Sequence, residues 1–408
     1  MKSGPWTPLS HPLFRAMWIA SVASNIGTWM HTVAAGWLMT TLALSPLLVA
    51  LVQTATTLPT CLLALPAGAL ADTVNRRHWL IFSQTWLLLA AAALGVLSLM
   101  GVIGPWWLLG LTFALGIGSG FNGPAWAAAI PELVSREELA AAVALNAVSF
   151  NIARAIGPAL GGLMMAATSA GVVFLVNAAS FLGVIVVLWV WRYEKPVREE
   201  PDAALHHAMR DGLRYIRDTS AYHAVLIRVG FFAFAGSALW ALLPVVASAG
   251  LAMTSLGYGI LLGCLGSGCI VAASGLTKLR SMYPVDRLVA VGNVAFAFAT
   301  IALVTMHRFA PVAGAMVVGG MAWMLTMANF NVTAQMAPPA RMRARALAVY
   351  LMVFQGVTAL GSGFWGALAD RIGVNGALIG STIMLLAGLA IAPRLPLAQE
   401  EQEVVSVG

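Results

Sequence analysis

Long apolar runs recur along the whole chain, and this pattern restricts what the chain can fold into more than any other feature. A run of about 20 apolar residues crosses the hydrocarbon core of a bilayer as one helix. Only 9% of the residues are charged, against roughly 25% in soluble domains. A soluble core has no room for so much apolar surface, so the sequence predicts an all-α protein that crosses the membrane many times.

Twelve of these runs qualify as membrane-spanning helices. They cover residues 13–41, 47–71, 79–101, 105–128, 139–168, 171–192, 222–248, 254–277, 287–307, 310–333, 345–369 and 374–393. The first run is too long for a cleavable signal peptide and has no small-residue cleavage site, so we expect it to remain as a membrane anchor.

One long polar insert separates the first six runs from the last six. The predicted domains are a six-helix bundle at 1–192, a cytoplasmic linker at 193–221, a second six-helix bundle at 222–394 and a disordered cytoplasmic tail at 395–408. Within the linker, Leu213, Tyr215 and Ile216 lie among charged residues, which is typical of an amphipathic helix on the inner membrane surface. A solvated linker helix is the alternative.

Basic residues in the loops predict the orientation, because cytoplasmic loops of membrane proteins are rich in Lys and Arg. With the N-terminus inside, the cytoplasmic side holds Lys2, Arg15, Arg76, Arg77, Arg136, Arg192, Lys195, Arg198, Arg210, Arg214, Arg217, Arg228, Lys278, Arg280, Arg287, Arg341, Arg343, Arg345 and Arg394. The outside holds only Arg308 and Arg371, so both termini are predicted to be cytoplasmic. The net charge of +7 is spread over many segments, unlike the single basic patch typical of nucleic-acid binding.

The sequence carries no signal for an enzyme, a cofactor or a metal site. Cys61, Cys264 and Cys269 lie in predicted spans without CxxC spacing, so we interpret them as packing residues and not as a disulfide framework. A GxGxxG pattern at 361–366 lies inside a span with no preceding strand, which argues against a dinucleotide site. There is no phosphate-binding loop, and no cluster of His, Asp or Glu marks one membrane face.

The two halves of the chain resemble each other. PELVSREELAAAVALN at 131–146 aligns without a gap with QMAPPARMRARALAVY at 335–350, and the same offset places Gly157 on Gly361 and Gly162 on Gly366. Both halves start inside, and in both a charged loop leads into a long glycine-rich run. Two parallel six-helix repeats are the arrangement of the major facilitator superfamily.

The loop GALADTVNRR at 68–77 resembles the signature loop of that superfamily, which has a glycine, an aspartate four residues later and a basic pair. Thr73 stands where an arginine is usual, and Asn75 stands where a glycine is usual. Asn tolerates the left-handed backbone that the glycine would supply, whereas the missing arginine removes one charge. The matching residues are Gly68, Asp72, Arg76 and Arg77.

The resemblance implies a latch on the cytoplasmic side. A carboxylate binds well at a helix N-terminus, where free N–H groups and the helix dipole favour an anion. Asp72 would meet the start of the span at 345–369, near residues 341–345, and Glu132 lies at the same side. The alternative is a loop that only sets topology. A second copy, GALADRIG at 366–373, falls on the outer side, where we expect Asp370 and Arg371 to form a helix-end pair.

The fifth span contains the segment ARAIGPALGG at 153–162. Pro158 cannot bond the carbonyl of residue 154, so a kink is expected there. Gly157, Gly161 and Gly162 allow a neighbouring helix to approach closely. The pattern GPxxGG resembles the motif of the superfamily's drug:proton antiporters, with Ala153 in place of a further glycine. A plain packing seam is the alternative, and it is compatible with the first because moving halves need such a seam.

Arg154 lies near the middle of the same span. An arginine at the centre of a bilayer costs at least about 2.5–3.5 kcal/mol, so it must face water, a partner or a substrate. Every acidic residue lies at a span end, in a loop or in a tail, which leaves Arg154 without an obvious carboxylate partner. Two roles remain open: contact with substrate or gating, and a structural anchor that bonds nearby carbonyls, Asn146 or Asn151.

Other polar and aromatic residues at membrane depth are predicted to line a cavity together with Arg154. They are Asn25, Trp29, His31, Gln53, Asn122, Asn151, Trp240, Asn329, Asn331 and Gln355. Amides bond a ligand without charge, and aromatic faces stack on planar ligands. Each of these residues can instead make an ordinary contact between helices.

Proton coupling has no obvious carrier, because antiporters of this kind place a carboxylate in the cavity and none is found at mid-membrane. The relay candidates are Asp72, Glu132 and His31, and indirect coupling is the alternative. For His31, a packing role competes with proton transfer.

Across nearly the whole chain the sequence resembles the enterobactin-exporter-like and macrolide-efflux-like permeases. The resemblance rests on residues 121–162, on DGLRYIRDTSAYHAVLI at 211–227 and on WALLPVVA at 240–247. It implies a monomer in the bacterial inner membrane that exports a hydrophobic drug, siderophore or secondary metabolite by alternating access, with the proton gradient and the lipid bilayer as its other partners. A lysophospholipid flippase on the same fold and a non-transporting membrane scaffold are the alternatives.

Overall fold

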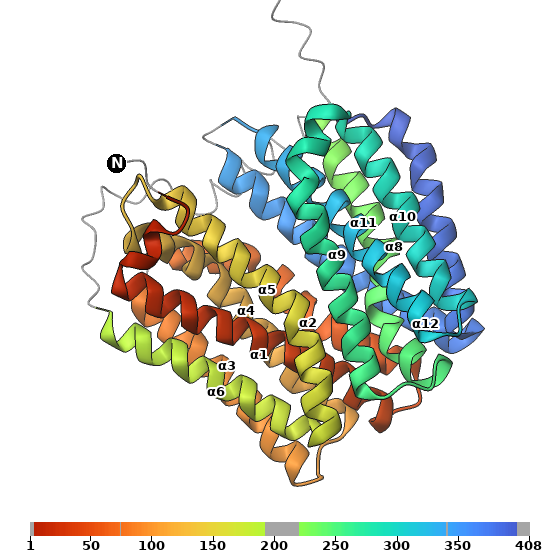
Figure 1. Ribbon diagram of the computed structural model, residues 1–408, viewed down its shortest axis with the longest axis horizontal. Helices are drawn as coiled ribbons and strands as arrows, with labels where there is room; N and C mark the ends of the chain where they lie inside the picture. Colours follow the sequence, from red (N-terminus) through yellow and green to blue (C-terminus); the bar gives the residue numbers. More distant parts are fainter. Residues whose placement is uncertain (1–3, 74, 192–219, 340–341, 398–408) are drawn as a thin grey trace, which may run out of the picture.

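The computed structural model describes residues 4–73, 75–191, 220–339 and 342–397, and all the regular structure in these ranges is helical. Figure 1 shows two bundles side by side, with α1–α6 in red through yellow-green and α8–α12 in green through blue. The predicted linker lies almost entirely outside the described residues, as does the tail beyond Leu397. The all-helical, two-bundle architecture agrees with the fold class predicted from the apolar runs.

The N-terminal bundle follows the first six predicted spans closely. It contains a 3-10 turn (Thr7–Ser10), α1 (Pro12–Leu42), α2 (Pro46–Thr73), α3 (Arg76–Leu99), α4 (Pro105–Leu133), α5 (Leu139–Ala167) and α6 (Ala170–Val190). Proline opens α1 and α4, where its missing N–H costs nothing. α5 continues through Pro158 as one helix.

Asn75 begins α3 in a way that the sequence analysis did not foresee. Its backbone is extended, with φ −64° and ψ 114°, and not left-handed. Its side-chain oxygen accepts a hydrogen bond from the His78 N–H at 3.2 Å. The residue that replaces the usual glycine is therefore a helix N-cap, a position that Asn strongly favours.

The C-terminal bundle holds the remaining spans in four long helices and one interrupted helix. Its elements are α8 (Ser220–Val245) with a π-helical turn (Val246–Gly250), α9 (Ser255–Met282), α10 (Val285–Thr305), α11 (Phe309–Met336), α12 (Arg343–Ile391) and a 3-10 turn (Ala392–Arg394). α12 contains two predicted spans, because Gly373 breaks it with a φ of 83°. That backbone conformation favours glycine.

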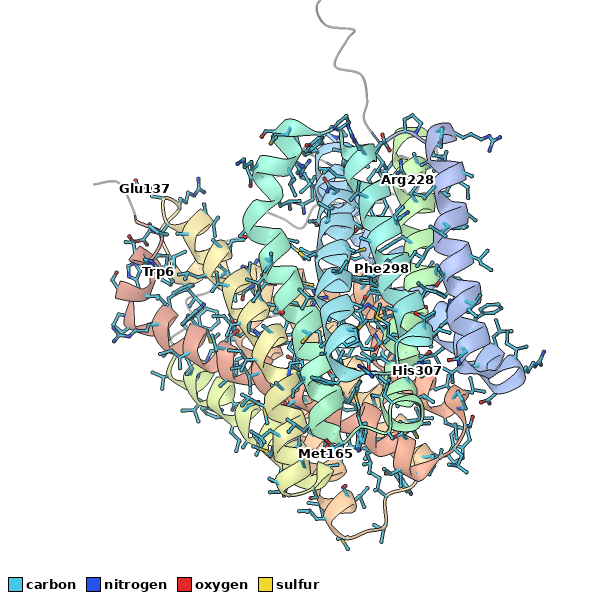
Figure 2. The ribbon with its side chains drawn as sticks, turned by 45° about the vertical axis from the view of Figure 1, so that its right-hand side comes forward. Trp6, Glu137, Met165, Arg228, Phe298 and His307 are labelled. Carbon is cyan, nitrogen blue, oxygen red and sulfur yellow. The ribbon has the colours of Figure 1, made fainter. Side chains whose placement is uncertain are left out.

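Nine helical segments of the described chain are long and apolar enough to cross a membrane, and α12 counts among them once. α1 and α4 are outside this set, although they have 31 and 29 residues. Figure 2 places Glu137 and Arg228 toward one end of the bundles and Met165 and His307 toward the other. This is the distribution that the predicted orientation requires, with the first pair on the cytoplasmic side.

The largest contacts between the bundles are those of α2 with α12 and of α5 with α9; α2 also packs against α8, and α1 touches α8 and α9. In Figure 1 the bundles lie close together at the end far from the N-terminus and diverge toward the N-terminal end. Close contacts follow the same pattern, since the outer ends of α5 and α9 meet at Gly162 and Gly259. The interface is thus tight on the side predicted to face outward.

Candidate functional site

A cavity of about 300 Å³ lies at membrane depth, mainly inside the N-terminal bundle. Helices α1 to α6 supply most of its wall, and α8 and α9 of the other bundle close one side. Polar lining residues are Ser24, Asn25, Thr28, His31, Thr32, Gln53, Thr56, Gln84, Thr112, Ser119, Asn122, Asn177, Trp240 and Tyr258. Its size falls at the lower end of the range of small-molecule sites, about 300–1,000 Å³.

Five residues singled out in the sequence line this cavity: Asn25, His31, Gln53, Asn122 and Trp240. Asn25 donates to the Ser149 hydroxyl at 3.1 Å, which ties α1 to α5. The Asn122 side-chain oxygen accepts from the Gln84 amide at 3.0 Å, which ties α4 to α3. These bonds fix the amide orientations at the cavity wall.

Other candidates lie away from the lining. Asn151 donates to its own helix at the Ala147 carbonyl, at 3.0 Å. Asn329 is completely buried in α11 and donates to the Leu325 carbonyl at 2.7 Å. Asn331 accepts a short hydrogen bond from Gln335 one turn later on the same helix, and Gln355 is not among the lining residues. A polar residue in an apolar helix has two faces to choose from, and the sequence alone does not specify which one it takes.

Arg154 lies beside the cavity, at the junction of the two bundles. Its guanidinium carbon lies over the ring of Trp29 on α1 at 5.8 Å and over that of Trp240 on α8 at 5.5 Å. Its Nε has no hydrogen-bond partner in the described part of the chain. Two indoles, one from each bundle, therefore supply the favourable contacts that a carboxylate would otherwise make.

The glycines of GPxxGG face two different helices. A Cβ added to Gly157 would come 2.6 Å from Trp29 Cβ, and one added to Gly161 would come 2.7 Å from Met30 Cα, so both glycines seat α5 on α1. At Gly162 an added Cβ would lie 2.5 Å from the Ser255 carbonyl oxygen of α9. The motif thus provides one contact inside the N-terminal bundle and one between the bundles.

On the predicted cytoplasmic side, the basic pair of the signature loop bonds within its own bundle. Arg76 forms an ion pair with Glu132 and donates to the Ala128 carbonyl at 3.0 Å. Arg77 donates to the carbonyl at the end of α6, Leu188, at 2.8 Å. Both arginines lock α3 to its neighbours. The latch residues Gly68 and Asp72 lie in the last turns of α2, outside the part of the chain whose side chains are described.

On the predicted outer side, Asp370 joins the two bundles. Its carboxylate accepts from the Ser45 hydroxyl at 2.8 Å and from the Leu47 N–H at 3.3 Å. Ser45 and Leu47 flank the first residue of α2, so Asp370 occupies the N-terminus of a helix from the other half. We expected a local pair with Arg371; the carboxylate instead bonds across the interface, because free N–H groups at a helix start favour an anion.

Several cavity residues were missed in the sequence, among them Gln84, Thr112 and Asn177. The amides could have been found by the reasoning that selected Asn122, since Gln84 and Asn177 are also uncharged polar residues inside long apolar runs. Thr112 gives no such signal, because threonine commonly bonds its own helix backbone. His31 packs its ring on Phe174, with 4.6 Å between the centroids.

A cavity at membrane depth, bounded by two like helical bundles that meet along close-packed glycines, defines a polytopic membrane transporter. The sequence comparison is more specific. The chain belongs to the transmembrane secretion effector family of the major facilitator superfamily, whose model matches residues 3–407. Members of this family are transporters and not enzymes.

Three curated relatives support this assignment. A multidrug efflux pump, Tap, of Mycolicibacterium fortuitum is 27% identical over 402 residues, which cover 93% of this chain and 95% of the relative. The staphyloferrin A transporter of Staphylococcus aureus is 25% identical over 62% of this chain and 64% of the relative. An uncharacterised transporter of Bacillus subtilis, YfiS, is 28% identical over 51% of this chain and 52% of its own length. The chain thus spans about half to two thirds of the last two.

Solved structures share the fold at low identity. A bacterial homologue of the human lysosomal transporter Spinster, inward-facing and unoccupied, superposes with a TM-score of 0.75 at 16% identity, covering 93% of this chain and 95% of that one. A mutant of the nucleoside transporter NupG superposes with a TM-score of 0.78 at 12% identity, covering 93% and 99%. These likenesses establish the major facilitator fold.

Proposed function

We propose that the chain exports a hydrophobic small molecule from a bacterial cytoplasm by alternating access, coupled to the proton gradient. In this proposal twelve spans cross the inner membrane, both termini are cytoplasmic and the working unit is a monomer. The observation that carries the proposal is the membrane-depth cavity, walled by both bundles and adjacent to their glycine-rich contact. Rocking of two bundles about such a contact would expose the cavity to each side in turn.

The relatives support the direction and the kind of cargo. One of them is a multidrug efflux pump, and another is a staphyloferrin A transporter. We therefore expect a drug-like, siderophore-like or secondary-metabolite cargo with apolar surface.

Arg154 is assigned a gating or cargo-contact role. Its guanidinium lies between Trp29 and Trp240, which belong to different bundles. Any movement that separates the bundles removes one of these two indoles and leaves the charge to water or cargo. The arginine therefore senses the relative position of the halves.

The two copies of GALAD, at 68–72 and 366–370, suggest a pair of alternating latches. Asp370 holds the outer side closed by capping α2, and Asp72 would cap the start of α12 when the inner side closes. Loss of a charged cap costs about 1 kcal/mol. Asp370→Asn should therefore favour closure of the inner side, and Asp72→Asn should disfavour it.

Spin-label distances between the predicted cytoplasmic ends of the bundles test this pair of latches. Labels at residues 137 and 278 should come closer on average in Asp370→Asn and move apart in Asp72→Asn. Equal shifts in the same direction would contradict the alternation.

Export is tested by retention of fluorescent and drug-like compounds in cells that lack their own pumps. Cells with the wild type should retain less than empty cells, and a protonophore should abolish the difference. Arg154→Ala should reduce efflux at least tenfold, whereas Lys278→Ala, an exposed cation on α9, should leave it unchanged. Equal retention with and without the transporter, over the whole panel, would exclude export of these compounds.

The proton relay candidates differ in their surroundings. Glu132 is held in an ion pair by Arg76, whereas His31 is one of the residues that line the cavity. We therefore propose that His31 is the group that couples cargo to protons. In proteoliposomes, His31→Gln should allow substrate exchange but abolish transport driven by a pH gradient.

A further inference from the structure

In the described part of the chain, five residues that line the cavity carry six buried polar atoms without a hydrogen-bond partner. They are His31 Nδ1, His31 Nε2, Gln84 Oε1, Thr112 Oγ1, Asn177 Oδ1 and Trp240 Nε1. The exposed fractions of His31, Gln84, Thr112 and Asn177 are 6%, 3%, 4% and 2%. Buried polar groups in native proteins are paired as a rule, so a cluster of unpaired ones marks a place that takes up a ligand.

These atoms come from separate helices, so no single local distortion explains them. His31 lies on α1, Gln84 on α3, Thr112 on α4 and Asn177 on α6. Gln84 and Asn177 offer oxygen acceptors, the Trp240 indole offers a donor, and Thr112 offers both. Neutral His31 offers one donor and one acceptor. An occupant must therefore present donors and acceptors close together.

The cavity wall excludes a charged occupant. Among the residues that the structure describes, no Asp, Glu, Lys or Arg lines the cavity, and the titratable lining residues are His31 and Tyr258. A buried charge needs an opposite charge or a dense set of hydrogen bonds to replace its hydration. The guanidinium carbon of Arg154 lies 5.5 Å from the ring of Trp240, which lines the cavity, and this nearby positive charge disfavours a cation further.

The rest of the wall is apolar. Val49, Val52, Leu87, Leu115, Phe150 and Phe181 complete the lining. The cavity therefore presents a polar cluster and an apolar surface to the same molecule. An amphiphilic ligand with one hydrogen-bonding group fits both parts.

We propose that this cavity binds an uncharged, hydroxyl-rich group of the cargo, with the His31–Gln84–Thr112–Asn177 cluster as its recognition element. A hydroxyl donates and accepts at once and rotates to suit its partners, so neighbouring hydroxyls satisfy this mixed set. The assignment of the ligand as cargo rests on the function proposed above.

The test is direct binding of phenyl β-D-glucoside to the purified full-length protein in lipid nanodiscs, followed by calorimetry and thermal stabilisation. Two counterparts keep the same shape and add a charge: phenyl β-D-glucuronide is an anion, and the phenyl glycoside of glucosamine is a cation. The neutral glucoside should bind saturably, and each charged counterpart should bind at least about tenfold more weakly.

Two variants test the cluster itself. Thr112→Val keeps the shape and removes one hydroxyl, and His31→Phe keeps the ring and removes both nitrogens. Each should weaken glucoside binding by about tenfold, as expected for a lost hydrogen bond in a buried site. Thr300→Val is the matched control, because Thr300 is completely buried in α10, bonds the Phe296 carbonyl of its own helix and does not line the cavity.

Equal affinity for the three glycosides, absence of saturable binding by the glucoside, or unchanged affinity in both cluster variants would overturn the proposal. Tighter binding of the glucuronide would assign the site to anions through Arg154 instead. Binding is measured without a gradient or flux, so a protein that binds the glucoside but exports nothing would contradict the transport proposal alone.

Discussion

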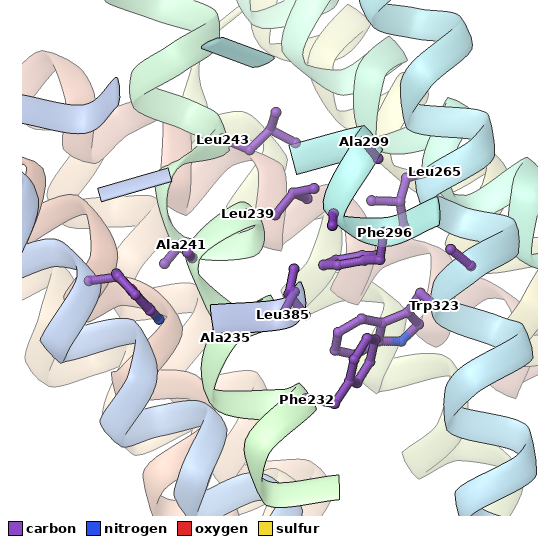
Figure 3. Packing of buried hydrophobic residues seen from close by; sticks show 14 of the residues in the cluster. Phe232, Ala235, Leu239, Ala241, Leu243, Leu265, Phe296, Ala299, Trp323 and Leu385 are labelled. Carbon is purple, nitrogen blue, oxygen red and sulfur yellow. The ribbon is translucent and has the colours of Figure 1, made fainter. Parts of the chain in front are cut away.

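The two bundles have similar helices but different interiors. In the C-terminal bundle, Phe232, Phe296 and Trp323 pack ring against ring, with centroids 5.4–5.5 Å apart. Figure 3 shows these aromatic residues together with leucines and alanines of the same cluster. The N-terminal bundle instead supplies most of the wall of the cavity.

This difference teaches that the repeat specifies helix lengths and topology but leaves the interior free. A bundle filled by interlocking rings moves as a rigid body, because close-packed cores do not deform continuously. A bundle that holds a polar cavity is less densely packed, and the cavity leaves room for a ligand. We therefore propose that the C-terminal bundle is the more rigid partner and that the N-terminal bundle carries recognition.

The largest expected effect is in the aromatic cluster. Trp323 is 8% exposed and contacts aromatic rings of α8, α10 and α12. Trp323→Ala should lower the free energy of unfolding by about 3–5 kcal/mol, from lost burial and the cavity left behind. Thermal unfolding of the purified protein in nanodiscs measures this.

The matched change in the other bundle is Thr112→Val, which replaces an unpaired hydroxyl by a methyl group of similar size. It should leave the unfolding free energy unchanged or raise it by up to about 1 kcal/mol, because no hydrogen bond is lost and a buried polar group is removed. If Trp323→Ala and Thr112→Val lowered the free energy of unfolding by similar amounts, the two interiors would be equally well packed.

Sequence reasoning predicted the helices well because the signal is strong and local. Runs of about 20 apolar residues specify a membrane helix without any knowledge of its neighbours. Even the break in α12 fell between the predicted spans 345–369 and 374–393, where Gly373 allows a positive φ. Sequence reasoning noted only that Asn75 tolerates a left-handed backbone; it did not foresee that the Asn75 side chain caps α3.

The site was predictable only in part, because it depends on which helices become neighbours. Asn122 and Asn329 give the same sequence signal, yet the first lines the cavity and the second is buried in α11. Asp370 was predicted to pair locally, and its true partners are more than three hundred positions away in the sequence, at Ser45 and Leu47. Such pairings are properties of the assembled bundles.

The second-largest expected effect on stability concerns the contact between the bundles at α5 and α9. A Cβ at Gly259 would lie 2.4 Å from the Pro158 carbonyl oxygen and 3.0 Å from Gly162 Cα, and both are backbone atoms that cannot turn aside. Gly259→Ala should therefore force α5 and α9 apart at a cost of about 1–3 kcal/mol. Spin-label distances across the predicted outer ends of α5 and α9 should lengthen, and efflux should fall.

Gly275→Ala is the control on the same helix, because nothing lies within 4 Å of its added Cβ. It should leave the distances and efflux unchanged and should stabilise the helix slightly, since Ala is favoured over Gly by about 1 kcal/mol. If Gly259→Ala behaves like this control, the α5–α9 contact does not hold the bundles together.

The smallest expected effect concerns the polar side-chain contacts that hold the helices of each bundle together at the predicted cytoplasmic end. In the C-terminal bundle, Arg228 and Asp286 form an ion pair, and Asp286 also accepts from the Leu397 N–H at 3.1 Å. In the N-terminal bundle, His11 Nε2 lies 2.9 Å from a carboxylate oxygen of Glu138, at the start of α5. The second contact involves the carboxyl group of Glu138, whose pKa is lowered, so its strength should depend on pH.

The hydrogen bond with His11, followed by those from Ser135, holds the pKa of Glu138 below its ordinary value, which is about 4.3. A lowered carboxyl pKa means that the folded protein favours the ionised form, so this stabilisation is fully present above the ordinary pKa. This stabilisation is lost as the pH falls from the ordinary pKa through the lowered pKa.

The melting temperature of the wild type should therefore drop over this acid range more than that of Glu138→Gln, which has no proton to gain. His11→Ala removes the main cause of the shift, so its acid loss should start at the same pH, end at a higher pH and have a smaller total. Parallel melting curves for all three proteins across the acid range would mean that this contact does not tie α5 to the N-terminus, and that the two bundles differ in their interiors alone.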